Sequence, residues 1–94
     1  MQPAVERLTQ IGSLPSSSTA TASVLRELEA LLGKVQTPIT DDETRALVRL
    51  FGPDDCFGLA WSLLHLIETS PGWPIEDALG LNGEWIEKLA ERSA

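Results

Sequence analysis

The stretch DDCFGLAWSLLHLIET, residues 54–69, decides how the rest of the chain is organised. Its apolar residues cover most of the circumference that a helix would present, and a helix of that kind is buried on most sides. We therefore expect a central helix over about residues 54–69, ended by Pro71-Gly72, with the other elements packed around it. The apolar residues are Phe57, Leu59, Ala60, Trp61, Leu63, Leu64, Leu66 and Ile67. Of these, we expect Phe57, Ala60, Leu63, Leu64 and Ile67 in the core.

The few polar residues of this stretch recur at steps of three and four. They are Asp55, Gly58, Ser62, His65 and Thr69. Such spacing places them along one side of a helix, which is either an exposed edge or the wall of a polar groove. Glycine inside a helix costs about 1 kcal/mol relative to alanine, so the close approach of another helix is the simplest reason for Gly58. Gly58, Ser62 and His65 are candidate partner-binding residues.

The chemistry available in the stretch is limited. His65 has Ser62 and Glu68 within one helical turn, which permits a general base beside a carboxylate. No third orienting group or oxyanion hole is visible, and one histidine with one cysteine is too few for a metal site. We expect Cys56 to be buried and inert, because Asp54 and Asp55 oppose a thiolate. We assign no catalytic, cofactor-binding or metal residue.

Helical patterns also flank the stretch on both sides. We expect a short helix in residues 1–12, a flexible Ser/Thr-rich linker in 13–23 and a helical body in 24–94. The body should contain a helix capped by Ser23 and Gly33, and a second opened by the capping box Thr40–Glu43 and stopped at Gly52-Pro53. A short helical turn that begins at Trp73-Pro74 and is closed by Gly80 should follow, and then a last helix capped by Asn82. No stretch has the pattern of a strand. The expected fold is all-α, a small bundle of four to six helices, with Trp73 and Trp85 covering the core.

Acidic residues cluster where these helices begin, which complements the helix dipole. Short connections make successive helices antiparallel, so several clusters should meet at one pole of the molecule. Arg45 is the only basic residue expected close to that pole. The acidic residues expected there are Asp41, Asp42, Glu43, Glu68, Glu76 and Asp77, of which all but Glu68 are candidate partner-binding residues.

Composition narrows the function classes. The 94 residues carry 14 acidic and 7 basic side chains, a net charge of −7, which disfavours nucleic acid and favours a basic partner. One cysteine permits no intramolecular disulfide. The first residues lack a signal-peptide pattern, and no apolar run reaches the ~20 residues of a membrane span. We therefore expect a cytoplasmic protein without a membrane or nucleic-acid partner and without a cofactor.

These features favour a small acidic protein-binding module, such as an inhibitor or immunity-type protein that covers the basic surface of a nuclease toxin. The alternative is a structural or accessory homodimer without catalysis. A small hydrolase-like enzyme using His65 and Glu68 is the least favoured hypothesis. An exposed apolar patch beside the acidic pole would favour the inhibitor, and a groove at His65 with convergent polar groups would favour the enzyme.

Overall fold

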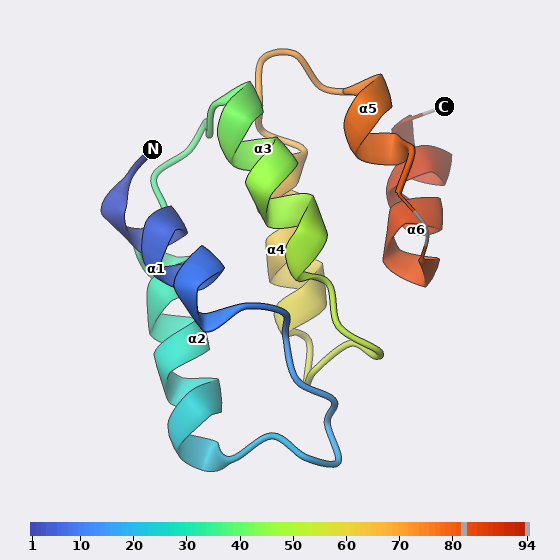
Figure 1. The fold of residues 1–94 in the computed structure, drawn as a ribbon. Helices are drawn as coiled ribbons and strands as arrows, with labels where there is room; N and C mark the ends of the chain where they lie inside the picture. Colours follow the sequence, from blue (N-terminus) through green and yellow to red (C-terminus); the bar gives the residue numbers. More distant parts are fainter. Residues whose placement is uncertain (82, 94) are drawn as a thin grey trace.

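The computed structural model describes residues 1–81 and 83–93, and within them the chain is all-α, with no strand. This confirms the predicted fold class. Figure 1 shows how the elements follow one another in space. The helices are α1 (Pro3–Ile11), α2 (Ala22–Lys34), α3 (Asp41–Leu47), which continues into the 3-10 turn η1 (Val48–Leu50), α4 (Leu59–Ile67), α5 (Glu76–Leu79) and α6 (Glu84–Ser93).

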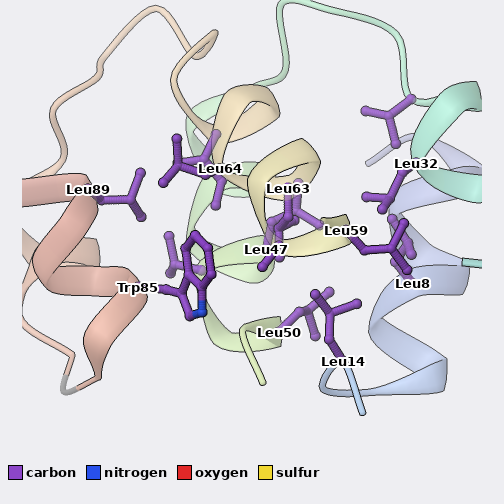
Figure 2. Packing of buried hydrophobic residues seen from close by; sticks show 14 of the residues in the cluster. Leu8, Leu14, Leu32, Leu47, Leu50, Leu59, Leu63, Leu64, Trp85 and Leu89 are labelled. Atoms are coloured by element: carbon purple, nitrogen blue, oxygen red, sulfur yellow. The ribbon is translucent and has the colours of Figure 1, made fainter. Parts of the chain in front are cut away.

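Helix α4 lies in the middle of the molecule, as predicted. It contacts α2, α3 and α6, while α1 packs on α2 and α3 at one side (Figure 1). Leu63, Leu64 and Ile67 of α4 are fully buried. Leu47 of α3 and Leu89 of α6 lie in the same cluster, which joins the two halves of the chain (Figure 2). The radius of gyration, 12.3 Å, is close to the ~12.4 Å of a compact chain this long, so all the helices share one core.

The start of the central helix differs from the prediction. Helix α4 begins at Leu59, and Cys56, Phe57 and Gly58 before it have positive φ angles of 48°, 55° and 89°. The Asp54 carboxylate accepts hydrogen bonds from the backbone N–H of Cys56 at 2.9 Å and of Ser17 at 3.0 Å. It therefore stabilises a tight turn instead of a first helical turn.

Two expectations at this turn were wrong. Phe57 was expected in the core, but 66% of its surface is exposed. Gly58 was expected inside a helix facing a closely packed neighbour, but it is the N-cap of α4, and a Cβ there would meet nothing within 4 Å. Glycine suits the position because its φ of 89° lies in the left-handed region.

The segment before α2 is anchored at several points. Leu14 is buried, and its N–H donates to the carbonyl of Leu50 at 2.8 Å. Gly52 passes so close that a Cβ at this position would overlap the Leu14 carbonyl. Helix α1 is itself docked, since Val5 and Leu8 are fully buried. Residues 13–23 therefore contain more anchors than their composition indicates, and their flexibility stays a prediction.

The helix ends agree with the sequence in part. The capping box is present: Glu43 N–H donates to Thr40 Oγ1 at 3.1 Å, and Thr40 N–H donates to Glu43 Oε1 at 2.9 Å. The short helix before Gly80 is also present, but it begins at Glu76 and not at Trp73-Pro74. The caps predicted for α2 were wrong, because Thr21 caps its start and the helix continues through Gly33 to Lys34. The predicted cap Asn82 lies outside the described residues.

Candidate partner-binding surfaces

The predicted acidic pole forms where α3 begins and α5 lies beside it (Figure 1). Arg45 holds the two helices together, since its guanidinium donates to Asp42 Oδ1 and to Asp77 Oδ2, both at 3.0 Å. Asp41 accepts from the backbone N–H of Gly72 at 2.9 Å, which ties the chain after α4 to the same place. Glu76 is exposed. We use "acidic pole" for Asp41, Asp42, Glu76 and Asp77.

Glu43 does not belong to the exposed part of this pole, because only 3% of its surface is accessible. Both oxygens are used inside the fold: Oε1 accepts from Thr40 N–H, and Oε2 accepts from Gln2 N–H at 3.0 Å. Burial works against ionisation, but these backbone donors outweigh it and hold the pKa of Glu43 below its usual value. Glu43 therefore joins α1 to α3 and is not available to a partner.

The region around the acidic pole contains more basic side chains than the sequence analysis expected. Arg92 of α6 donates to both oxygens of Glu68 at 2.9 Å, so Arg45 is not the only basic residue in this region. The hydrogen bonds and charge of Arg92 lower the pKa of Glu68 despite partial burial. Local sequence pattern does not indicate this pair, because its members are separated by 24 residues.

The stripe of Gly58, Ser62 and His65 does not form one site. Ser62 lines an apolar groove of about 340 Å³ between α2 and α4, together with Leu32 and Leu59. His65 is exposed and lies beside Trp61, with ring centroids 6.4 Å apart. Gly58 caps α4 and adds no polar side chain.

The most exposed apolar side chains near α4 are Phe57 and Trp61. Trp61, which belongs to the apolar residues of the expected central helix, is 40% exposed, and it meets the buried ring of Trp85 edge-on at 5.0 Å. Trp61 and His65 are one turn apart on α4, and Phe57 lies in the turn that precedes this helix. We use "aromatic edge" for Phe57, Trp61 and His65. Sequence reasoning missed this surface because the spacing of Phe57 and Trp61 matches the apolar pattern of a buried helix.

The side chains that could support catalysis in and before α4 are paired or buried. Its Nδ1 lies 3.6 Å from Glu68 Oε1, but that carboxylate is already paired with Arg92. Cys56 is buried, and burial together with Asp54 and Asp55 raises the pKa of its thiol. Among residues 1–81 and 83–93, no group of three or more His, Cys, Asp or Glu side chains has the arrangement of a metal site.

Comparisons with protein-family models, curated proteins and solved structures found no match. In the part of the chain that the structure describes, no helix is both long and apolar enough to cross a membrane. Fold and surface together define a small acidic all-α protein with an acidic pole and an aromatic edge.

Proposed function

We propose that this chain is a protein-binding module that contacts a basic surface of its partner. The observation that carries the proposal is Phe57, which combines high exposure with a left-handed backbone, φ 55°. A non-glycine residue in that conformation costs of the order of 1–3 kcal/mol, and such strain clusters at functional positions. The Phe57 side chain contributes little packing, because 66% of its surface is exposed, so the hydrogen bonds of the turn, such as Gly58 N–H to the Asp55 carbonyl at 3.1 Å, have to offset this cost.

The neighbouring Trp61 strengthens the argument. Large aromatic side chains, tryptophan above all, are enriched among the few residues that dominate binding energy at protein interfaces. Asp55 lies two residues before Phe57 and is exposed, whereas the Asp54 carboxylate beside it is engaged by Ser17 and Cys56. The aromatic edge together with the exposed Asp55 carboxylate suits a partner surface with apolar contacts and basic side chains.

The net charge of −7 supports a basic partner through long-range attraction. The acidic pole lies toward the other end of α4, which is about 13 Å long at 1.5 Å per residue. The inhibitor hypothesis anticipated an exposed apolar patch beside the acidic pole. The exposed aromatic residues instead lie toward the opposite end of α4. In our proposal the aromatic edge makes the contact and the acidic pole accelerates the encounter. An inhibitor that covers a basic enzyme is one form of such a module.

The test uses Phe57→Gly, because glycine accepts a φ of 55° without strain. We expect the free energy of unfolding to stay unchanged or to rise by up to ~1 kcal/mol. Affinity capture from a lysate of the source organism should yield a protein of basic isoelectric point with the wild type. Its affinity for Phe57→Gly, measured with the purified partner, should be at least ~10-fold weaker, as for loss of an interface anchor.

Val24→Ala is the matched control, because Val24 is an exposed apolar residue of α2 that is distant in sequence from the aromatic edge. It should retain full affinity. A partner that binds Phe57→Gly as tightly as the wild type, or that is itself acidic, would contradict the proposal.

An accessory homodimer is the second candidate, because the aromatic edge of one copy can pack on that of another. The charge of −7 on each copy opposes it. Light scattering over a range of concentrations should give a monomer mass. A dimer that Phe57→Gly dissociates would instead support the homodimer.

A further inference from the structure

A hollow of about 310 Å³ lies between η1 and the beginning of α6. One wall is aromatic, because the rings of Phe51 and Trp85 stack at 5.7 Å with only 6° between their planes. A volume of this size is at the lower end of small-molecule sites. The residues that matter in it are Arg49, Phe51, Leu81, Glu84, Trp85 and Ile86.

Trp85 provides a hydrogen-bond donor without a partner. Its side chain is 5% exposed, and its indole Nε1 makes no hydrogen bond within the described residues. A buried donor left unpaired costs about 1–3 kcal/mol, so such groups are few in native proteins. Figure 2 shows the nitrogen on the side of the ring away from Leu64, at the level of Leu50, where η1 ends. Trp85 lines the hollow and its Nε1 is covered, so an acceptor in the hollow reaches this donor after a small shift of the wall.

Arg49 provides the charge. It is exposed and forms no ion pair in the described part of the chain. Glu84 is the only acidic residue that lines the hollow, and it lies 3.6 Å from the ammonium group of Lys88. The guanidinium of Arg49 therefore remains available to an anion, although the whole molecule is acidic.

We propose that this hollow binds a small aromatic carboxylate. The flat ring packs against Phe51 and Trp85, one carboxylate oxygen accepts from Trp85 Nε1–H, and Arg49 pairs with the negative charge. The site does not involve the aromatic edge as a contact surface, so the inference is independent of the proposed function.

The experiment uses benzoate as the probe and the indole N–H resonances of the intact chain as the readout. The three indole signals are assigned with Trp61→Phe and Trp73→Phe. We expect benzoate to shift the Trp85 signal in a saturable manner and to leave the Trp73 signal in place. Benzamide, which has nearly the same shape without the charge, should bind more weakly.

Arg49→Gln should weaken benzoate binding about 10-fold, as for one charge-assisted hydrogen bond. Arg26→Gln is the matched control, because Arg26 is also exposed and unpaired within the described residues but lies on α2. Circular dichroism checks that both variants fold. The inference is overturned if benzoate does not shift the Trp85 signal. It is also overturned if benzamide binds as tightly as benzoate, or if Arg49→Gln and Arg26→Gln weaken benzoate binding equally.

Discussion

At the scale of single residues, Glu43 shows how a buried contact removes a side chain from a predicted surface. The sequence pattern predicts two roles for Glu43, one in a capping box and one in an exposed acidic pole. In the structure Glu43 is buried and has only the first role. The contact with Gln2 N–H decides between them, since it closes α1 over the start of α3. Nothing in the local sequence indicates that contact, because the two residues are 41 positions apart.

The lowered pKa of Glu43 predicts a loss of stability in acid. An unfolded glutamate titrates near ~4.3, and the folded pKa lies below that value. Between the two, the unfolded state binds more protons, so the free energy of unfolding falls as the pH drops through this window. Urea melts between pH 7 and pH 3 should show this decline, to which Asp54 and Glu68 contribute in the same direction because their pKa values are also lowered.

The variant Glu43→Gln isolates one contribution. The glutamine amide has one acceptor oxygen in place of two, so one of the two backbone N–H donors loses its partner. We expect the free energy of unfolding to fall by roughly 1–3 kcal/mol at pH 7 and to decline less steeply below pH 5. Glu76→Gln is the control, because Glu76 is exposed, and it should leave the decline unchanged. If Glu43→Gln kept the full wild-type decline, the depressed pKa would not reside on Glu43.

At the scale of elements, the sequence predicts the middle of each helix better than its beginning. In α4 the spacing of Leu63, Leu64 and Ile67 places them correctly in the core, because packing there follows helical periodicity. The beginning is wrong because Asp54 is held by Ser17, a contact over 37 residues that periodicity does not contain. Phe57 lies in the turn that Asp54 also stabilises through the Cys56 N–H, outside the helix, and is exposed there. The aromatic edge was therefore not predictable from local pattern. The position of the acidic pole was predictable, because it depends on where helices begin and on short connections between them.

The contact between Asp54 and Ser17 predicts where the chain resists protease. Ser17 N–H and its hydroxyl both donate to the Asp54 carboxylate. We therefore expect limited proteolysis of the wild type to cut within residues 18–21 and not at residues 14–17. In Asp54→Ala the susceptible region should extend to residues 14–17 and cleavage should become several times faster, since fewer contacts hold that backbone.

Asp55→Ala is the matched control, because Asp55 is the neighbouring carboxylate and no hydrogen bond to its side chain is present in the described part of the chain. It should digest like the wild type. Rapid cutting throughout residues 13–23 in the wild type would instead support the flexible linker predicted from composition.

At the scale of the whole molecule, the net charge of −7 is distributed unevenly and partly neutralised. Arg45 and Arg92 pair with carboxylates near the acidic pole, so the field there is weaker than the count of acidic residues indicates. Asp42 and Glu76 remain exposed, and Arg45 keeps Asp77 if Asp42 is replaced. These two positions therefore permit a change of charge that leaves the bridge between α3 and α5 in place.

The double reversal Asp42→Lys/Glu76→Lys tests whether the acidic pole steers a basic partner. Each reversal adds two charges, so the net charge goes from −7 to −3. We expect association with the captured partner to slow about 10-fold at low salt and the dissociation rate to stay the same, because charges outside the contact act on the encounter. Stopped-flow kinetics at low and high ionic strength measures both rates, and near ~1 M salt the difference should vanish because screening acts within ~3 Å.

The matched control is Glu6→Lys/Glu29→Lys, which makes the same change of net charge on α1 and α2. Both glutamates are exposed and form no ion pair in the described residues. If the pole is the steering element, this control slows association less than the pole variant does, because the approaching partner is attracted by the local field more than by the total charge. Equal slowing in the two variants would show that net charge alone drives the encounter, and a faster dissociation of the pole variant would place the pole inside the contact with the partner.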